Sequence, residues 1–481
     1  MPSLESLRDA SYSQSLFEDK TWRHSPVPLP LSSAQIEEIH RIGAACLAFY
    51  HAQELLYQRS AQRKRLLRNG GDEAPWVAEY LDRGKPEGLV AHGRSRAAKG
   101  QVPLVLRPDL LLTDDGFTMT EMDSVPGGVG LAAFLNRLYA PEFPGVVGGD
   151  GRQIHLFHQA LRSLAPPASK TAARDDEAGA GEARAQEPRI AIVVSAEAST
   201  YRPEFEWLAS ELRAQGHPVF CVAPEDILAS GNGIYIPVNG APERIDVLYR
   251  FFELFDLGNV RGADAIFDAV EAGHVAITPP MKAFQEEKLN LALVHHPALA
   301  DFWRENLPAC HLETIRRTVP RTWIMEDVAL PPVAVLHAPF VNNRPIRAWG
   351  ELANAAQKER NLIIKASGFH ETAWGARSVV LGSDVSREEW LAAIEDAIDG
   401  DNETLHVLQD YHKPRRITHP VFRADGTLEN MEGRVRLCPY YFAQRGSSSA
   451  ELGAILATIC PADKKIIHGM KDAAMLPCME V

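Results

Sequence analysis

Apolar and polar residues follow one another with periods that predict a mixture of helices and strands. Residues 33–66 carry apolar side chains at helical spacing, which predicts a long helix near the N-terminus. Further along, short apolar runs typical of buried strands occur at 189–196 and 217–223, with a helical segment at 204–216 between them. This β-α-β pattern predicts a small α/β sheet within residues 189–277.

A second region of alternating elements begins at about residue 278. The expected elements are helices at 281–296 and 387–399, and strands near 362–366, 378–382 and 405–409. Together with the smaller sheet, they predict an α/β or α+β fold with a core at 278–481.

The segment 166–188 separates these regions from the first 165 residues. It contains no valine, isoleucine, leucine, methionine or aromatic residue, so it cannot bury a core. We therefore predict a flexible linker there, following an N-terminal helical region at 1–165.

The most informative segment is 102–130, where two strand-like runs flank the turn-forming sequence Asp-Asp-Gly at 114–116. A three-residue hairpin loop, with Gly116 in the left-handed conformation, fits this sequence. The facing pairs would be Thr113–Phe117, Leu111–Met119, Asp109–Glu121 and Arg107–Asp123. Because side chains alternate between the faces of a strand, all four charged residues would share one face.

Three carboxylates on one face, balanced by Arg107 alone, would repel one another. A divalent cation would remove this repulsion, and Mg²⁺ prefers carboxylates together with phosphate oxygens. Arg107 could then contact phosphate. Two alternatives stay open on this reasoning: the charged face simply meets water, or a two-residue turn at Asp115-Gly116 shifts the register and splits the carboxylates between faces.

Lys365 is the lysine of the apolar strand at 361–366 and is followed by a loop containing Gly368 and Gly375. The lysine could neutralise nucleotide phosphates while backbone N–H groups near the glycines contact phosphate oxygens. A surface hairpin with a solvent-facing lysine is the alternative.

The strings R-P-D at 107–109 and E-M-D-S-V-P-G-G at 121–128 resemble the circularly permuted ATP-grasp proteins related to glutathionylspermidine synthase. In that family an R-x-D strand is followed by E-x-N at similar spacing. The resemblance implies that Asp109, Glu121 and Asp123 hold magnesium, as two ions, and that Arg107 contacts phosphate. Asp123 stands where the family usually has Asn, which adds a negative charge to the site.

The resemblance covers residues from about 75 to the C-terminus and includes three more segments. Lys365 with its glycine loop is similar to the lid over the ATP phosphates. The strand end Gln409-Asp410-Tyr411 is similar to the segment that pairs with adenine. Lys282 and Lys288 both lie in a stretch similar to the helix that carries a second nucleotide-binding lysine, and Lys288 matches the pattern because it precedes the LNLAL run.

The order of these motifs implies the permuted subtype, because the carboxylates precede the lysines along the chain. Residues 189–277 would then be a preATP-grasp-like domain beside the core at 278–481. Family members also carry arginines near Arg434 and Arg436, which implies a role toward substrate or phosphate. Arg250 lies in an apolar segment, where a buried arginine needs partners.

Composition narrows the class of protein. A net charge of −13 and a pI near 5.7 argue against non-specific binding to nucleic acid or to anionic membranes. Six scattered cysteines without a C-x-x-C pair, and no apolar signal or membrane-spanning segment, lead us to expect a cytoplasmic protein. The sequence also lacks the P-loop, Rossmann, zinc-protease and α/β-hydrolase motifs.

The function that the resemblance implies is an ATP-dependent carboxylate–amine ligase, which forms an amide bond through an acyl phosphate. Its cofactors would be ATP and Mg²⁺, and its partners a small-molecule or peptide carboxylate and an amine. Two alternatives are a nucleotide-binding protein without ligase activity and a phosphoryl transferase acting on a non-carboxylate acceptor.

Overall fold

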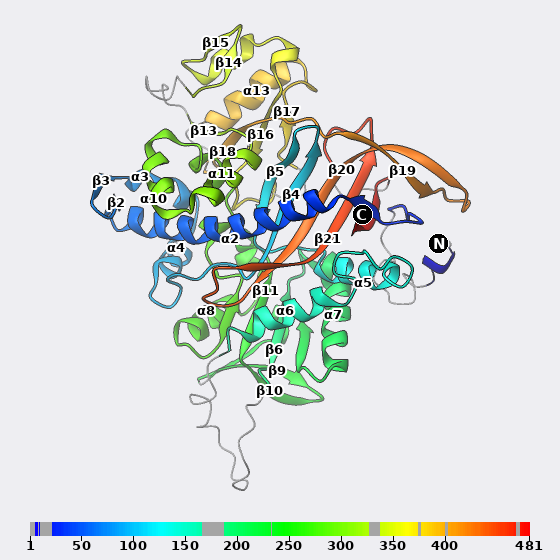
Figure 1. Cartoon of the computed structure of the whole chain (residues 1–481). Coiled ribbons are helices and arrows are strands. Elements are labelled where there is room, and N and C mark those ends of the chain that lie inside the picture. Colours follow the sequence, from blue (N-terminus) through cyan, green and yellow to red (C-terminus); the bar gives the residue numbers. More distant parts are fainter. Residues whose placement is uncertain are drawn as a thin grey trace.

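A computed structural model describes residues 5–7, 9, 22–165, 187–231, 233–326, 337–373, 377–399, 403–467 and 472–481. The expected linker at 166–188 lies outside these residues except for its last two positions, and so does Gly375. The described residues form a mixed α/β structure (Figure 1). None of their helices is both long and apolar enough to cross a bilayer.

The largest sheet of the described residues joins strands from opposite ends of the chain. Its order is β1-β22-β21-β20-β4-β5, with β19 beside β20. The strands are β1 (Leu29–Leu31), β4 (Val105–Thr113), β5 (Gly116–Asp123), β19 (Arg416–Phe422), β20 (Leu428–Ala443), β21 (Ala450–Pro461) and β22 (Ala474–Glu480). Figure 1 shows β4 and β5 beside the orange and red strands β20 and β21. The hairpin thus returns to a sheet made mainly by the C-terminal part of the chain.

The turn of the β4–β5 hairpin has two residues, where the sequence predicted three. Thr113 pairs with Gly116, so Asp114 and Asp115 form the loop, and Thr113 Oγ1 donates a hydrogen bond to the Gly116 carbonyl at 2.9 Å. Gly116 has a positive φ of 115°. The expected pairs Thr113–Phe117 and Leu111–Met119 are therefore wrong.

A β-bulge at Thr120 compensates for the shorter turn. Leu110 pairs with Met119, and the next pair joins Asp109 to Glu121, so Thr120 is an extra residue on β5. Beyond the bulge the expected pairs Asp109–Glu121 and Arg107–Asp123 are both present. The turn is one residue shorter than predicted and the bulge adds one residue, so the two changes cancel. This excludes the alternative in which the carboxylates are split between the two faces.

One long helix, α2 (Ser33–Ala61), packs on the strands of this sheet with α5 (Val129–Tyr139) and α6 (Arg152–Arg162). The helix starts with a capping box between Ser32 and Gln35. It ends before the predicted residue 66, because Arg63 has a φ of 48°, which a helix cannot continue through.

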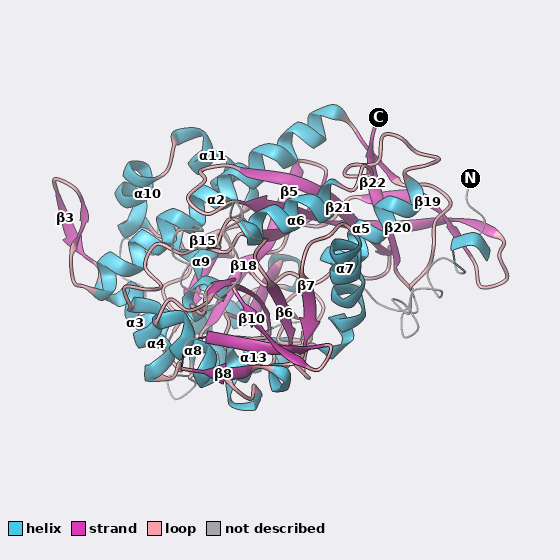
Figure 2. Ribbon diagram, turned by 90° about the horizontal axis from the view of Figure 1, so that it is seen from below, coloured by secondary structure: helices cyan, strands magenta, loops and turns pink. Residues whose placement is uncertain are grey.

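The β-α-β pattern at 189–277 forms a four-stranded parallel sheet of order β12-β11-β6-β7. Its elements are β6 (Ile190–Val194), α7 (Arg202–Ala214), β7 (Val219–Val222), β11 (Val247–Phe251), α8 (Ala263–Glu271) and β12 (Ala276–Thr278). A small antiparallel sheet of β8 (Leu228–Ser230), β9 (Gly233–Val238) and β10 (Ala241–Ile245) interrupts it in sequence. Figure 2 shows α7 beside β7.

A third sheet, of order β13-β18-β16-β17, is antiparallel. Its strands are β13 (Thr322–Met325), β16 (Leu362–Ala366), β17 (Val380–Leu381) and β18 (His406–Asp410). Helix α13 (Arg387–Ile398) packs against it, close to the predicted helix at 387–399.

The expected helix at 281–296 is wrong as a continuous element. A 3-10 turn at Ala283–Glu286 is followed by a short helix, α9 (Leu289–Leu293). The amide of Lys288 donates to the Ser367 carbonyl at 2.8 Å instead of a helical partner, and Asn290 Nδ2 donates to the Glu287 carbonyl at 2.9 Å. The tertiary bond to Ser367 and this local side-chain bond accompany a break in the helix at Lys288.

The remaining helices and strands lie around these three sheets. They are β2 (Arg65–Leu67), β3 (Gly70–Glu73), α3 (Pro75–Asp82), α4 (Glu87–Arg94), α10 (Ala300–Asn306), α11 (Ala309–Thr318), β14 (Phe340–Val341) and β15 (Arg344–Pro345).

Candidate functional site

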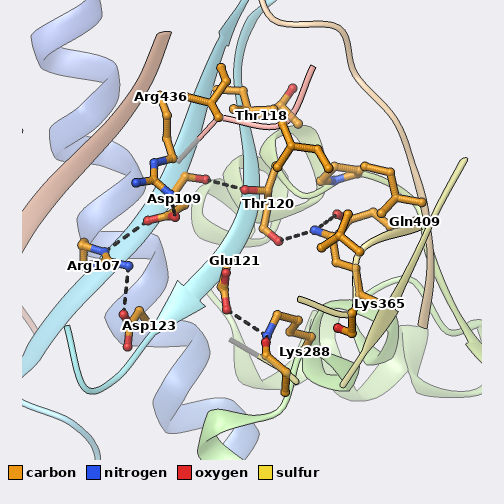
Figure 3. A pocket seen from close by; sticks show the side chains of 18 of the residues that line it. Arg107, Asp109, Thr118, Thr120, Glu121, Asp123, Lys288, Lys365, Gln409 and Arg436 are labelled. Atoms are coloured by element: carbon orange, nitrogen blue, oxygen red, sulfur yellow. Dashed lines mark hydrogen bonds and ion pairs between the residues drawn. The ribbon is translucent and has the colours of Figure 1, made fainter. Parts of the chain in front are cut away.

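A pocket of about 380 Å³ is lined by residues from the largest sheet, from the parallel sheet and from the antiparallel sheet β13-β18-β16-β17. The β4–β5 hairpin, the β16–β18 pair and the segment after β11 contribute side chains, and Lys288 comes from the start of α9 (Figure 3). The pocket brings together these residues named from the sequence: Arg107, Asp109, Glu121, Asp123, Lys288, Lys365, Gln409, Asp410 and Tyr411.

The bulge decides which hairpin side chains face the pocket. On β4 the lining residues are Arg107, Asp109 and Leu111, and on β5 they are Thr118, Thr120, Glu121 and Asp123. The alternation of β5 is broken at Thr120, so that Thr120 and Glu121 both reach the pocket. Without the extra residue, the two-residue turn would send Glu121 and Asp123 to the opposite face.

Asp109 is buried at the base of the hairpin, with 4% of its surface exposed, and is held by two arginines. Arg107 Nε donates to its Oδ1 at 3.1 Å and Arg436 Nη1 to its Oδ2 at 2.9 Å. Burial alone would raise the pKa of Asp109, but the charges of Arg107 and Arg436 outweigh burial and lower it. Asp109 is therefore a carboxylate at neutral pH.

Asp123 and Glu121 each face one cation. Arg107 Nη2 lies 2.9 Å from Asp123 Oδ2, and Lys288 Nζ lies 2.9 Å from Glu121 Oε1. Burial raises the pKa of Asp123, and the charge of Glu121 adds to this effect against that of Arg107. The negative charge on Asp123 is thus only partly compensated by the protein.

Arg107 is not the only positive charge beside the three carboxylates, although it is the only one that the hairpin sequence supplies. Arg436, on β20, and Lys288 supply two further positive charges. Both come from segments far from the hairpin in sequence, so spacing within the hairpin could not reveal them. Of the two arginines singled out in that segment, Arg436 reaches the pocket, whereas Arg434 Nη1 donates to the Lys464 carbonyl at 2.8 Å and does not line it.

Lys365 is not solvent-facing, which excludes the alternative of a surface hairpin lysine. Only 7% of its surface is exposed, and its Nζ donates to Gln409 Oε1 at 2.9 Å and to the Thr120 carbonyl at 3.2 Å. Burial and the charge of the nearby Lys288 together lower the pKa of Lys365 to about 8, against the charges of Glu121 and Asp109. This lysine reaches from the third sheet to the bulge of the hairpin.

Gln409 is used inside the protein, since its Nε2 also donates to Thr322 Oγ1 at 3.0 Å. The amides of Asp410 and Tyr411 donate to the carbonyls of Arg321 and Asn361, both at 2.9 Å. The amides of Asp410 and Tyr411 are therefore already bonded within the protein, and the segment 409–411 forms part of the pocket wall.

Gly368 does not line this pocket but lies beside it, in a smaller cavity that also contacts Glu121, Asp123 and Lys288. A Cβ atom at Gly368 would lie 2.9 Å from the Glu287 carboxyl carbon, which explains a glycine there. Lys288 Nζ also donates to the Ala373 carbonyl at 2.6 Å, which ties this loop to the carboxylates.

Two other residues named from the sequence have structural partners. Lys282 Nζ lies 2.8 Å from Glu54 Oε2 and donates to the Gln101 carbonyl at 2.9 Å. Arg250 is fully buried, where it pairs with Glu286 and donates to the Phe252 carbonyl at 2.6 Å. Neither residue lines the pocket.

Glu253 is a pocket residue that sequence reasoning missed. It follows the carboxyl end of the parallel strand β11, which is where sites form in open α/β sheets, and this position was the available signal. Burial raises the pKa of Glu253 to about 8, and the charges of Glu286 and Asp123 add to the effect. The pocket therefore contains a carboxyl group that is largely protonated at neutral pH.

The donor set suits magnesium, because it consists of carboxylate oxygens on one face of a rigid hairpin. Glu121 is the most exposed of the three, at 37% of its side chain, and Asp123 carries charge that the protein leaves partly uncompensated. Both oxygens of Asp109 already accept from arginines. The oxygens of Asp123 also have partners: Oδ2 lies 2.9 Å from Arg107 Nη2, and Oδ1 accepts from the Val125 amide at 2.8 Å. Glu121, the most exposed of the three, is therefore the best placed to take up a cation.

Comparison with known proteins gives one curated relative and a set of similar folds. No family profile matches the chain. A protein of Frankia alni named "Putative glutamate--cysteine ligase 2-3" is 30% identical over 201 residues, which cover 39% of this chain and 21% of that protein. The chain thus matches only about a fifth of the length of this relative.

Among solved structures, a glutathione synthetase-like effector from Globodera pallida aligns over 98% of this chain and 95% of its own, with a TM-score of 0.56 and 12% identity. A "Putative gamma-glutamylcysteine synthetase" from Methylobacillus flagellatus aligns over 94% and 89%, with a TM-score of 0.43 and 11% identity, which is too low to support an argument. The chain therefore has a mixed α/β fold similar to that of the glutathione synthetase-like effector.

Proposed function

We propose that this protein is an ATP- and magnesium-dependent ligase that joins a carboxylate to an amine through an acyl phosphate. The observation that carries the proposal is the meeting of Glu121 and Asp123 with Lys288 and Lys365 in one pocket. Interleaved carboxylates and lysines are what a magnesium–triphosphate complex needs, since the metal binds the carboxylates and the lysines bind phosphate oxygens.

In the proposed complex, the triphosphate lies between the hairpin and the third sheet. Lys365 and Lys288 would donate to phosphate oxygens, and their partners Gln409 and Glu121 hold them in position for this role. The adenine would lie against the strand end at 409–411 and accept or donate hydrogen bonds through its edge. Magnesium, when bound, would neutralise charge on the transferring phosphoryl group.

The chemistry has two steps. A substrate carboxylate oxygen attacks the γ-phosphorus of ATP, the bond to the β–γ bridging oxygen breaks, and an acyl phosphate and ADP result. An amine then attacks the acyl carbon, phosphate leaves, and the amine loses a proton. Arg107 and Arg436 would stabilise the negative charge that develops on the phosphoryl oxygens.

We further propose that the fold is the circularly permuted ATP-grasp arrangement related to glutathionylspermidine synthase. The pairing of β4 with β20 supports it, because the metal-binding hairpin precedes the lysines in sequence yet joins the C-terminal sheet. Residues 189–277 would be the preATP-grasp-like domain, and 278–481 with the hairpin the ATP-grasp core.

The substrate class that we propose is an amino acid or short peptide as carboxylate and an amino compound as amine. The name of the Frankia alni relative, a glutamate–cysteine ligase, supports this class. Glutamate and γ-glutamyl peptides as carboxylates, and cysteine, glycine and polyamines as amines, form the first panel to test.

The test measures ADP and phosphate release by the full chain with each pair from this panel. We expect release only when ATP, Mg²⁺, a carboxylate and an amine are all present, with the amide product detected by mass spectrometry. Glu121→Gln should abolish turnover, while Asp114→Asn, in the exposed turn of the same hairpin, should retain it. ADP release that is independent of the amine would instead support phosphoryl transfer, and ATP binding without turnover on any pair would support a binding protein.

A further inference from the structure

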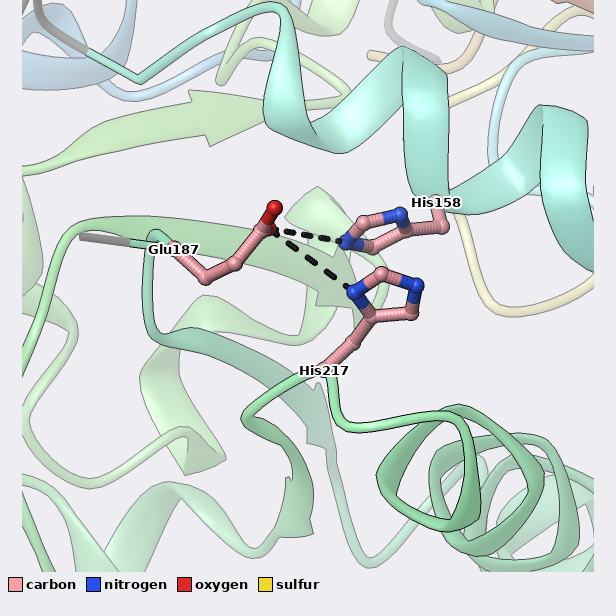
Figure 4. A group of neighbouring side chains, drawn as sticks. All are labelled: His158, Glu187 and His217. Atoms are coloured by element: carbon pink, nitrogen blue, oxygen red, sulfur yellow. Dashed lines mark ion pairs between the residues drawn. The ribbon is translucent and has the colours of Figure 1, made fainter. Parts of the chain in front are cut away.

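A second group of ligand-type side chains lies apart from the pocket. His158 comes from α6, Glu187 directly precedes β6, and His217 lies between α7 and β7 (Figure 4). None of the three lines the pocket described above. One nitrogen of each histidine and one carboxylate oxygen lie within 4.8 Å of one another, and Figure 4 shows them pointing toward a common point.

The three converging atoms share an unusual property: each is buried and has no hydrogen-bond partner. They are Nε2 of His158, Oε2 of Glu187 and Nδ1 of His217. His158 as a whole is 3% exposed. Buried polar atoms in folded proteins almost always have a partner, and an exception indicates a bound water or ion.

The distances favour a metal over the alternatives. His158 Nε2 lies 3.7 Å and His217 Nδ1 lies 3.8 Å from Glu187 Oε2. A direct hydrogen bond would require about 2.7–3.2 Å, and a water molecule bonded to both atoms would hold them about 4.6 Å apart. Two ligands of a tetrahedral zinc ion, each about 2.0–2.1 Å from the metal, lie about 3.4 Å apart. The observed separations are closest to this last arrangement.

Neighbouring contacts also orient the three side chains for binding a metal ion. Arg162 Nη2 lies 3.4 Å from the other carboxylate oxygen of Glu187, so the oxygen facing the histidines stays available. This is the kind of outer contact that orients a metal-binding carboxylate. The rings of His158 and His217 stack with their centroids 3.7 Å apart, which fixes both nitrogens on one side.

We propose that His158, Glu187 and His217 bind a divalent transition-metal ion, and that they prefer zinc. Two imidazole nitrogens select zinc and its neighbours over Mg²⁺ and Ca²⁺, which prefer oxygen ligands only. A fourth position is left for water, because the described residues offer three protein ligands. This site is independent of the proposed ligase reaction.

The ion would act as a clip between three segments of the chain. It would join α6, which packs on the largest sheet, to the start of β6 and to the loop before β7 in the parallel sheet. The ion would add to the contacts that α6 already makes with α7 and β11, and it would fix the residues that lead into β6. Metal binding is then coupled to stability rather than to turnover.

The experiment uses the full chain without a histidine tag, stripped of metal and titrated with Co²⁺ in excess Mg²⁺. Magnesium occupies sites made of carboxylates only, so the remaining Co²⁺ reports nitrogen-containing sites. We expect one Co²⁺ per chain with the visible absorption of a tetrahedral ion, displaced by one equivalent of Zn²⁺. Thermal melting should shift upward with Zn²⁺.

Two ligand variants and one control separate this site from surface binding. Glu187→Gln and His217→Gln change half-buried side chains that the fold tolerates better than a change at His158. Each should weaken Zn²⁺ binding by more than about 100-fold, since loss of even an outer-shell partner costs 10–100-fold. His155→Gln, on the exposed side of α6 one turn from His158, should bind as wild type does.

The proposal is overturned if the wild type binds no Co²⁺ under these conditions, which would indicate a bridging water at this position. It is equally overturned if both ligand variants bind Zn²⁺ with wild-type affinity, or if His155→Gln loses binding to the same extent. Circular dichroism of each variant establishes that it is folded before binding is measured.

Discussion

The ammonium group of Lys365 lies in surroundings that oppose its charge. Burial and Lys288 lower its pKa to about 8. The side chain is therefore mostly protonated at pH 7 and loses its charge as the pH rises above 8. A triphosphate beside it would favour the protonated form. We therefore expect the affinity for ATP to depend on pH through Lys365, and Glu253, which lines the same pocket and also has a pKa of about 8, should add to this dependence.

We expect Lys365→Met to weaken binding of Mg–ATP by about 10- to 100-fold at pH 7, because a hydrogen bond to a charged group contributes about 1.5–3 kcal/mol. In the wild type the Kd should rise above pH 8, where Lys365 and Glu253 both lose their protons, and the rise should be clearly smaller in Lys365→Met, which keeps only the contribution of Glu253. Isothermal titration between pH 7 and pH 9.5 measures both. The exposed Lys358→Met is the matched control, and an unchanged affinity in Lys365→Met would remove Lys365 from the site.

The pKa of Glu253 shifts upward, whereas that of Lys365 shifts downward. Burial and the charges of Glu286 and Asp123 raise the pKa of the Glu253 carboxyl to about 8. Its usual value is 4.5, so between pH 4.5 and pH 8 the folded chain binds more protons at this residue than the unfolded chain does. Its contribution to stability is therefore present at low pH and is lost as the pH rises through 8.

The ligand-free protein should thus lose part of its stability between pH 5.5 and pH 8.5, and Glu253→Gln should lose less over the same range. Urea midpoints at the two pH values give the comparison. The exposed Glu225→Gln should behave as the wild type does. A Glu253→Gln variant with the full wild-type pH dependence would show that another group causes it.

At the level of elements, the β4–β5 hairpin shows which features could be predicted from the sequence and which could not. Alternation of polar and apolar residues predicted both strands, and a three-residue loop at Asp-Asp-Gly predicted the pairs Asp109–Glu121 and Arg107–Asp123, which the structure contains. The two-residue turn and the bulge at Thr120 were not predicted, because each shifts the register by one and the end result is the same. A bulge leaves no pattern in the sequence when a short turn compensates for it.

The prediction of a continuous helix at 281–296 was wrong for a different reason. Its apolar residues do have helical spacing, but the Lys288 amide bonds to Ser367, which lies in the loop after β16. Local periodicity carries no information about such a distant partner. The break is useful to the site, since it places Lys288 at the start of a short helix facing Glu121.

The loop after β16 allows a prediction at this scale. A Cβ atom at Gly368 would lie 2.9–3.0 Å from the carboxylate of Glu287, which Lys85 Nζ holds at 2.6 Å and Ser367 also contacts. Gly368→Ala should therefore destabilise the protein by about 1–3 kcal/mol, as overpacking does elsewhere. Urea unfolding measures the change. Gly350→Ala, where nothing lies within 4 Å of the added atom, should be nearly neutral, and equal effects of both would contradict the contact argument.

For the whole molecule, the pocket exists only because three sheets from separate stretches of sequence meet. Lys365 crosses from the third sheet to the Thr120 carbonyl, and Lys288 crosses to Glu121 on the first. The local pattern predicted most strands, but not that Leu29–Leu31 joins the C-terminal strand β22 or that Arg436 balances Asp109. Pairings between the two ends of a chain have no local signal. The resemblance to a known family pointed to the return of the hairpin 102–130 to the C-terminal core, but not to these two contacts.

A magnesium–nucleotide complex bound in this pocket would hold the first and third sheets together, and this gives the last prediction. Wild type, Glu121→Gln, Lys365→Met and the double variant are melted with and without Mg²⁺ and a non-hydrolysable ATP analogue. At 100 times its Kd the ligand pair should stabilise the wild type by about 2.7 kcal/mol. Each single variant should lose most of this gain.

The double variant should lose little more than either single one, because both residues hold the same ligand from opposite sides. Without ligand, Glu121→Gln should be slightly less stable than the wild type, since Lys288 loses the carboxylate 2.9 Å away while remaining largely buried. If Glu121→Gln gains as much from the ligand pair as the wild type does, Glu121 is not a metal ligand. If the losses in the two single variants add fully, the two residues act on separate ligands and the two sheets do not share one nucleotide.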